Sequence, residues 1–306
     1  MTIAARDRRG WPRLWDNAYL LLAAVALFWA GNSIVGRGVK DSVPPFTLAL
    51  ARWTGALLIL APFAWNRVRH DRWTLLRRWK ETLLLGLLGV GAFNALLYSG
   101  LHYTTATNGL LIQSAMPPII LFLAYLLFRE TARPRQVIGV ALSMCGVLLI
   151  VARGQLGRLA QLQIGIGDVL VFAAVIAWSF YTVLLRLRPL VHPLSFLAAT
   201  FAIGIGAMLP LSILEWALGA RIVWSIGSIA ALFYVAIFPS LIAYLLFNRG
   251  VQLIGAGAAG QVLNLTPVFG ACLAIALLGE PFETYHLIGM ALILSGIALF
   301  ARGRRP

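Results

Sequence analysis

The sequence predicts an all-α integral membrane protein in which ten transmembrane helices form two inverted five-helix repeats, with both termini cytoplasmic. Three observations predict this fold: an apolar composition, a bias of basic residues toward alternate connections, and an internal duplication. Of the 306 residues, 60% are hydrophobic and only 11% are charged. A soluble domain carries roughly 25% charged residues, so water cannot be the solvent for most of this surface.

Ten apolar runs are long enough to cross a bilayer, whose hydrocarbon core of about 30 Å requires roughly 20 helical residues. They cover residues 17–37, 45–65, 82–102, 105–128, 134–151, 166–186, 193–213, 224–247, 255–278 and 284–301. We expect helices because lipid offers no partner to backbone polar groups and the alternation of barrel strands is missing from the sequence. The first run is interpreted as a retained span, because no small-residue cleavage site follows it.

The spans divide the chain into a cytoplasmic N-terminal segment (1–16), a first five-helix repeat (17–151), an extracytoplasmic linker (152–165), a second repeat (166–301) and a cytoplasmic tail (302–306). With the N-terminus inside, 19 of the 25 Lys and Arg residues fall on the inner side and 5 on the outer side. The inner group is Arg6, Arg8, Arg9, Arg13, the six basic residues of 66–81, Arg129, Arg133, Arg135, Arg186, Arg188, Arg249, Arg302, Arg304 and Arg305; the outer group is Arg37, Lys40, Arg153, Arg158 and Arg221. Cytoplasmic loops are enriched in Lys and Arg, so the formal charge of +15 is attributed to these loops and not to nucleic-acid binding.

The second half of the chain repeats the first at a shift of 150 residues. Residues 117–150 overlay residues 267–300 without a gap. The informative matches are Pro117 with Pro267, Glu130 with Glu280, Gly139 with Gly289, and Gly146 with Gly296; Pro45 and Pro62 match Pro193 and Pro210 at a shift of 148. An odd number of spans in each unit means that the second copy enters the membrane from the opposite side. Inverted repeats of this kind are typical of transporters that hold the substrate near the midplane, between the copies.

The stretch GAGAAG, residues 255–260, has the G-x-G-x-x-G spacing of a dinucleotide-binding turn. That pattern is meaningful only after a strand, at the start of the helix of a βαβ unit. Here it begins a predicted membrane span, so we interpret its small residues as sites where helix backbones approach closely. No cofactor is expected.

Neither an enzyme nor a metal protein is expected. The four histidines, at positions 70, 102, 192 and 286, are scattered over loops and span ends, whereas an active site needs clustered groups at one depth. Cys145 and Cys272 lie in apolar runs without ligands at metal spacing, and we expect them to be small buried hydrophobes.

Charged residues inside spans are candidates for function because they are costly there, and Arg52 is the one such residue. It could clamp a substrate carboxylate, or it could snorkel outward or bond neighbouring carbonyls as a structural residue, which we favour. Glu130 and Glu280 are expected to mark boundaries or order loops at equivalent span ends, with a direct role in transport as the alternative. Asp168 is expected to complement the dipole at the start of the sixth span. No mid-span Asp, Glu or Lys is present, which weakens a proton-antiport mechanism, although His102 could substitute near a span end.

Neutral polar and aromatic residues gather in spans one, three, four, six, eight and nine. Asn94 and Tyr98 lie four apart on one helix face, and their repeat partners, Tyr244 and Asn248, are the same pair in reverse order. Each such residue could join helices, but their concentration favours a cavity lined by amides and rings, suited to a small amphipathic solute. The candidate substrate-binding residues are Trp29, Asn32, Asn94, Tyr98, Gln113, Trp178, Tyr181, Tyr244, Gln261 and Asn264.

Three motifs carry a family resemblance: LFWAGNSIVGR (27–37), LALARW (48–53), and the duplicated Pro, Glu, Gly, Gly pattern. On these, the chain resembles the EamA family of the drug/metabolite transporter superfamily over nearly its whole length, and within it the YddG-type exporters of aromatic amino acids. The resemblance implies a bacterial inner-membrane exporter in which spans five and ten are peripheral, and a structural role for Arg52.

Together these features predict an exporter of amino acids, aromatic or large apolar ones foremost, working by alternating access between the repeats. Rings would contact the side chain of the substrate, and the amides would meet its amino and carboxylate groups. The alternative is an exporter of drugs or other toxic metabolites, cationic or lipophilic, on the same fold; it predicts a buried acidic residue, which the spans lack. The expected partners are a small-molecule substrate and the lipid bilayer, with the oligomeric state left open.

Overall fold

The computed structural model describes residues 12–39, 41–104, 106–155, 157, 165–278 and 281–303. Outside these ranges lie most of the N-terminal segment and of the linker, and the following residues named above: Arg6, Arg8, Arg9, Lys40, Arg158, Glu280, Arg304 and Arg305. Every regular secondary-structure element in these ranges is a helix, and none is a strand. This confirms the predicted all-α class.

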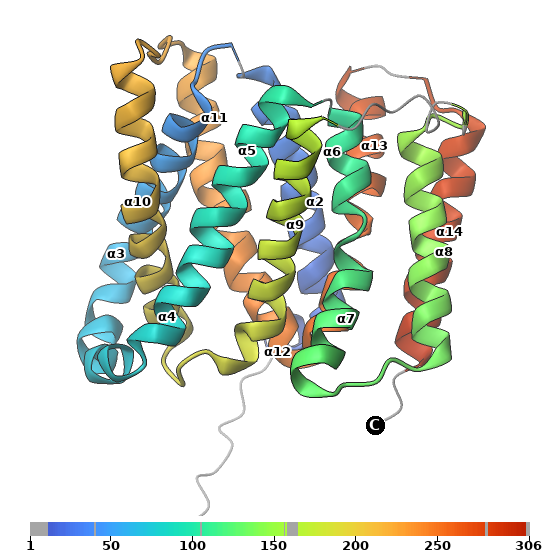
Figure 1. Ribbon diagram of the computed structural model, residues 1–306, viewed down its shortest axis with the longest axis horizontal. Helices are drawn as coiled ribbons and strands as arrows, with labels where there is room; N and C mark the ends of the chain where they lie inside the picture. Colours follow the sequence, from blue (N-terminus) through green and yellow to red (C-terminus); the bar gives the residue numbers. More distant parts are fainter. Residues whose placement is uncertain are drawn as a thin grey trace, which may run out of the picture.

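The first repeat consists of α2 (Ala18–Gly38), α3 (Pro45–Arg77), α4 (Trp79–Gly86), the π-helix η1 (Leu87–Ala92), α5 (Phe93–Tyr103), α6 (Ala106–Gln113), α7 (Met116–Phe128) and α8 (Pro134–Val151), after a short α1 (Pro12–Trp15). The second consists of α9 (Ile166–Leu184), the 3-10 helix η3 (Leu185–Leu187), α10 (Pro193–Ala217), α11 (Ile226–Ala236), the π-helix η4 (Ile237–Ile242), α12 (Ala243–Val262), α13 (Leu265–Leu278) and α14 (Thr284–Arg302). Figure 1 shows these helices as one bundle.

Within the described residues, nine helices are long and apolar enough to cross a membrane, so the chain is a multi-pass membrane protein. The predicted eighth and ninth spans, 224–247 and 255–278, do not appear as two separate helices. One helical run covers Ile226–Val262, with Gly255 in a non-helical conformation (φ 73°, ψ 165°) inside α12, and α13 follows it. The count of ten spans therefore remains a prediction.

Other boundaries differ because a helix does not end where its apolar stretch ends. The predicted second span stops at residue 65, but α3 continues to Arg77, since no glycine or proline interrupts residues 63–77. The predicted fourth span, 105–128, corresponds to the run Gly109–Phe128, which is one of the nine but contains a break. α6 ends at Gln113 and α7 begins at Met116, just before Pro117, whose ring provides no backbone N–H. The second repeat has the same break, between α12 and α13, just before Pro267.

Prolines and small polar residues mark the helix starts. Pro45 and Pro193, matched in the sequence repeat, are the first residues of α3 and α10. Proline suits this position, where an N–H would have no partner within the helix. The Ser225 hydroxyl accepts the Ser228 backbone N–H at 3.0 Å and caps α11.

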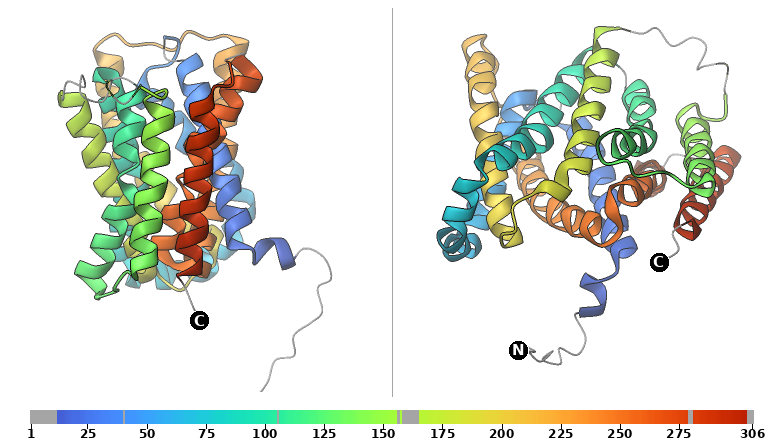
Figure 2. Two further views of the ribbon diagram at one scale, coloured as in Figure 1. Left: turned by 90° about the vertical axis from the view of Figure 1, so that its right-hand side faces the viewer. Right: turned by 60° about the horizontal axis from the view of Figure 1, so that its bottom comes forward.

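Two antiparallel pairs flank the bundle. α3 packs along α10, and α8 along α14 at the other end of the molecule, as Figure 1 and the turned views of Figure 2 agree. The Ser143 hydroxyl of α8 donates to the Ile293 carbonyl of α14 at 3.2 Å, inside that second pair. The side chains with candidate roles lie between these pairs, on α2, α5, α6, α9 and α12 and, for Asn264, in the turn between α12 and α13.

Cys145 and Cys272 correct one expectation. Both thiols are free, and both residues are exposed on the outside of the bundle instead of buried in it. In a membrane protein an apolar run does not imply contact with other helices, because the lipid is itself an apolar solvent.

Candidate functional site

Two π-helical segments occupy equivalent positions in the two repeats. Residues 87–92 of η1 and 237–242 of η4 are 150 positions apart, so the Gly89 and Pro239 carbonyls correspond. A π-turn interrupts the regular i→i−4 ladder, and such turns are frequent at functional sites. In η4 the cause is visible: Pro239 has no N–H to donate to the Val235 carbonyl, and the Ser240 hydroxyl donates to it instead at 2.5 Å.

Each of these carbonyls accepts a hydrogen bond from the other repeat. The Tyr244 hydroxyl donates to the Gly89 carbonyl at 2.6 Å. The Trp29 indole N–H and the Arg52 guanidinium each donate to the Pro239 carbonyl at 3.0 Å. The two π-segments therefore hold the repeats together in the middle of the bundle, where polar side chains from both meet.

Arg52 lies inside this junction and is only 4% exposed. Its Nε donates to the Ser240 hydroxyl at 2.5 Å, and one Nη donates to the Tyr98 hydroxyl at 2.9 Å and to Asn94 Oδ1 at 3.4 Å. The guanidinium carbon also lies 4.7 Å from the ring centre of Trp53. All these partners are neutral, and no carboxylate of the described chain forms an ion pair with Arg52. Arg52 thus bonds inward, to neighbouring elements, and does not snorkel outward.

Aromatic rings fill the space beside Arg52. The Trp178 ring lies 5.1 Å from Trp29, 5.0 Å from Tyr181 and 5.6 Å from Tyr244, between ring centres. Trp178 and Tyr181 are completely buried, and Tyr244 is 1% exposed. The distances fit the edge-to-face and tilted geometries that aromatic pairs prefer. We call Trp29, Trp178, Tyr181 and Tyr244, with Trp53, Phe201 and Phe247, the aromatic cluster.

Several buried donors at this cluster have no partner. Trp53 Nε1, Trp178 Nε1 and Asn248 Nδ2 make no hydrogen bond, although Asn248 Oδ1 accepts the Tyr181 hydroxyl at 2.8 Å. Leaving a buried polar group unpaired costs about 1–3 kcal/mol. Together with the uncompensated charge of Arg52, the cluster has an excess of donors, which is suited to a ligand with anionic or acceptor oxygens.

The ten predicted binding residues separate into two sets. Trp29, Trp178, Tyr181 and Tyr244 join the aromatic cluster, while Asn94 and Tyr98 join it through Arg52. The other four have different surroundings. Gln261 donates to the Ser143 hydroxyl at 2.6 Å and to the Gly139 carbonyl at 3.2 Å, which links α12 to α8.

The remaining three are not bonded to the cluster either. Gln113 donates to the Gly109 carbonyl of its own helix at 3.1 Å, and Asn264 is 4% exposed with an unpartnered Nδ2. Asn32 is half-buried on α2. All four therefore remain candidates whose side chains lie apart from the Arg52 network in this conformation.

The sequence-based candidates omit two polar residues of the junction, Ser240 and Asn248, and three rings of the aromatic cluster, Trp53, Phe201 and Phe247. Asn248 had a signal, because it completes the reversed Asn94–Tyr98 pair. Ser240 had none, since its role depends on the proline before it and on Arg52 folding across from the other repeat.

The carboxylates at span ends have structural partners. Asp168 Oδ2 accepts the Gly165 backbone N–H at 2.8 Å, and Asp168 Oδ1 accepts the Thr104 hydroxyl, at the start of α9. Glu130 forms an ion pair with Arg186. His102 is exposed at the end of α5, with its ring against Tyr103.

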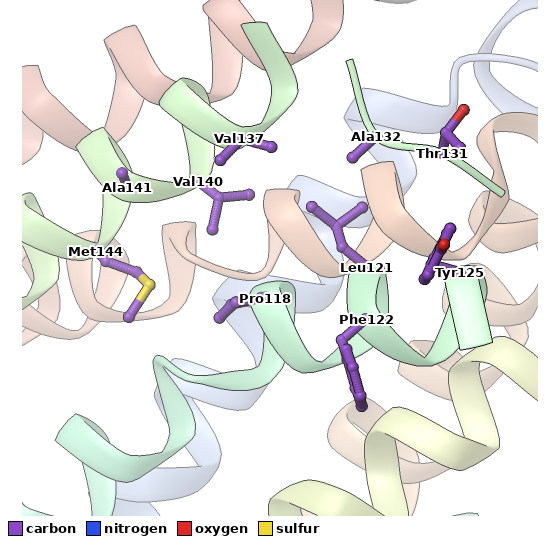
Figure 3. A pocket seen from close by; sticks show the side chains of 10 residues that line it. All are labelled: Pro118, Leu121, Phe122, Tyr125, Thr131, Ala132, Val137, Val140, Ala141 and Met144. Atoms are coloured by element: carbon purple, nitrogen blue, oxygen red, sulfur yellow. The ribbon is translucent and has the colours of Figure 1, made fainter. Parts of the chain in front are cut away.

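A cavity of about 530 Å³ lies away from the aromatic cluster, between α7 and α8. Its walls are almost entirely apolar, as Figure 3 shows, and none of the ten predicted binding residues lines it. Its residues are Pro118, Leu121, Phe122, Tyr125, Thr131, Ala132, Val137, Val140, Ala141 and Met144.

Comparison with known proteins agrees with this architecture. The chain matches the EamA-like transporter family twice, over residues 16–152 and 165–302. It is 31% identical to the uncharacterized transporter YyaM of Bacillus subtilis over 92% of both chains. It is 30% identical to an uncharacterized transporter of Archaeoglobus fulgidus, over 93% of this chain and 97% of the relative. A crystal structure with 21% sequence identity shares the fold, with a TM-score of 0.75 over 92% of this chain and 95% of the other.

Proposed function

Because the chain belongs to the EamA-like transporter family, we propose that it exports amino acids, aromatic or large apolar ones foremost, across a bacterial inner membrane. The observation that supports this substrate class most directly is the buried, uncompensated Arg52 beside the aromatic cluster. A guanidinium pairs well with a carboxylate, and rings accommodate a flat apolar side chain. A partner for the carboxylate and a partner for the side chain of such a substrate therefore lie next to each other.

The proposed topology has ten spans as two inverted repeats, with both termini cytoplasmic. Gly255 supports it, because its positive φ of 73° divides α12 into two helical parts. The first part would complete the eighth span with α11, and the second would form the ninth with α13. Figure 1 labels α11 and α13 toward one end of the bundle and α12 toward the other, as this reversal requires.

Alternating access would break and remake the contacts between the repeats. In the present conformation the rings of the aromatic cluster contact one another, so a substrate would have to separate them. The hydrogen bonds from Tyr244 to Gly89 and from Arg52 to Pro239 join opposite repeats and would change with this separation. Trp29, Tyr98, Trp178, Tyr181 and Tyr244 are the proposed ring contacts, and Arg52 and Asn94 the proposed polar contacts.

Cationic drugs fit this junction less well than amino acids. The charged group next to the rings is an arginine, and no described carboxylate pairs with it. A cationic ligand would therefore meet like charge in a desolvated position, where repulsion is strong. Neutral or anionic metabolites remain compatible with the same site.

Counterflow in proteoliposomes tests the proposal. Vesicles loaded with unlabelled amino acids are placed in labelled Phe or Trp, and uptake is compared with empty vesicles, with and without an imposed pH gradient. We expect accumulation that aromatic and large apolar amino acids support and that small or acidic ones do not. If no amino acid supports counterflow while a neutral drug or another metabolite does, the amino-acid assignment is wrong.

A further inference from the structure

The groove between α7 and α8 is open toward the surface of the bundle. Phe122 is 61% exposed, Tyr125 47% and Val137 54%. In a membrane these positions face hydrocarbon, so the groove is a recess in the lipid-facing surface. Figure 3 shows the side chains of the two helices projecting into it from opposite sides.

The floor of the groove is closed. Val140 is 5% exposed and packs in one cluster with Ala258 of α12 and Phe300 of α14. Leu121 and Met144, which line the groove, pack against the same cluster. The recess therefore ends on protein, and from Val137 to Met144 it follows α8 for about 10 Å at 1.5 Å per residue.

One end of the groove is basic. Thr131 and Ala132, in the loop between α7 and α8, close this end, and Arg129 lies just before them in the chain. Arg133 and Arg135 follow them, but Arg133 donates to the Gly303 carbonyl at 3.1 Å and the Cβ of Arg135 faces Gly303 at the end of α14. The Arg129 guanidinium lies 5.9 Å from the ring centre of Tyr125, which lines the groove. The acidic residue of the loop, Glu130, is neutralised by Arg186. Arg129 and Arg135 have no ion pair with any described residue.

The internal repeat provides a comparison for these residues. Arg129 has a left-handed backbone (φ 58°), which favours glycine, and its counterpart 150 residues later is Gly279. An arginine in this conformation carries backbone strain that a glycine would not carry. The groove aromatics and the other arginines also lack equivalents: Phe122 corresponds to Cys272, Tyr125 to Ile275, Arg133 to Glu283 and Arg135 to Tyr285.

We propose that the α7–α8 groove binds one anionic glycerophospholipid, with an acyl chain between the two helices and the phosphate at Arg129. The cavity volume of about 530 Å³ is comparable with that of a single long acyl chain. Basic groups next to membrane helices bind anionic headgroups, and the combination of an apolar recess with the unpaired Arg129 at its end matches both parts of such a lipid. The lipid would fill the space between α7 and the α8–α14 pair.

Native mass spectrometry of the detergent-purified full chain tests this site. The protein is offered equal amounts of phosphatidylglycerol and phosphatidylcholine with identical acyl chains, and the ratio of the retained lipids is measured. We expect a preference for phosphatidylglycerol that falls roughly fivefold in Arg129→Gly, since one arginine contributes about that factor at a membrane surface. Ala141→Trp, which fills the groove and keeps its charges, should lose the preference as well.

Two matched controls separate the site from general effects. Arg153→Gly removes an equal charge from the other non-glycine residue with a positive φ, 52°. Ala291→Trp adds the same bulk at the exposed repeat counterpart of Ala141. Both should keep the wild-type preference. If Arg129→Gly and Ala141→Trp keep the wild-type ratio of retained lipids, the proposal is wrong. It is also wrong if a groove variant converts dimers to monomers without changing this ratio, because a second copy of the chain would then occupy the groove.

Discussion

Gly139 of α8 packs directly against the backbone of Gly296 of α14: a Cβ atom on Gly139 would lie 2.6 Å from the Gly296 carbonyl oxygen. Gly146 stands in the same relation to Gly289, also at 2.6 Å. The sequence repeat equates Gly139 with Gly289 and Gly146 with Gly296. Gly139 therefore contacts the repeat counterpart of Gly146, and Gly146 contacts the repeat counterpart of Gly139. A pseudo-twofold axis between the antiparallel helices α8 and α14 requires this crossed arrangement. The same four glycines that reveal the duplication also join its two copies.

Gly139→Ala should destabilise the protein. Its new methyl group would overlap the Gly296 carbonyl, a backbone atom that cannot rotate away, and overpacking typically costs about 1–3 kcal/mol. Thermal unfolding in detergent measures the effect. Gly206→Ala is the control, because nothing lies within 4 Å of its Cβ position, and there the higher helix propensity of alanine should stabilise slightly. Equal stability of the two variants would contradict the close contact.

Glu215→Gln should weaken the attachment of α3 to α10. The Glu215 carboxylate accepts the backbone N–H groups of Phe46 and Thr47, at 3.1 and 2.8 Å, and the Thr47 hydroxyl at 2.6 Å, and so caps α3 from another helix. Loss of an N-cap costs about 0.5–2 kcal/mol. We expect a lower midpoint of thermal unfolding for this variant. Asp41→Asn, which neutralises an exposed carboxylate, should leave the midpoint unchanged. If both variants lower the midpoint equally, the cause is the change in net charge and not the loss of the cap.

Arg52→Gln should reduce counterflow by about tenfold or more, because hydrogen bonds to a charged group contribute about 1.5–3 kcal/mol. Arg52→Lys should recover part of the rate, since it keeps the charge but loses the planar fork. Arg221→Gln removes an exposed charge and is the control. Size-exclusion chromatography verifies that each variant is folded. Normal transport by a folded Arg52→Gln variant would exclude a substrate role for Arg52.

Tyr244→Phe should destabilise the junction more than Tyr103→Phe. The first change leaves the Gly89 carbonyl without its 2.6 Å donor in a buried place, at a cost of about 1–3 kcal/mol. Tyr103 is 67% exposed at the end of α5, so its hydroxyl contributes little there. Hydrogen exchange of η1 amides provides a local readout and should become faster in Tyr244→Phe alone. Unchanged exchange would mean that this bond does not stabilise η1.

The candidate site was predictable only as a set of residue types. The reversed pair Asn94–Tyr98 and Tyr244–Asn248 is visible in the sequence, and the structure does bring Tyr98 and Tyr244 to the junction between the repeats. Their partners could not be predicted. Tyr244 bonds a backbone carbonyl in the other repeat. Tyr98 bonds Arg52, for which the sequence favours a structural role, either snorkelling outward or bonding neighbouring carbonyls.

The sequence by itself determined the membrane environment, the helical class and the duplication. These depend on composition and period, because lipid requires every backbone polar group to be paired within the chain, and because Pro117, Glu130, Gly139 and Gly146 recur after 150 residues. None of these three properties requires knowledge of a three-dimensional contact.

Only the tertiary structure decided which polar groups meet. It showed Gln261 bonded to Ser143 and Gly139, so that this amide links helices, and it showed Arg52 bonded across the repeats to the Pro239 carbonyl. The physical reason is that a hydrogen bond depends on atoms about 3 Å apart, whereas the sequence specifies only which face of a helix a side chain occupies. The donors that reach the Gly89 and Pro239 carbonyls come from residues more than 150 positions away in the chain, so these bonds depend on how the helices of the two repeats pack.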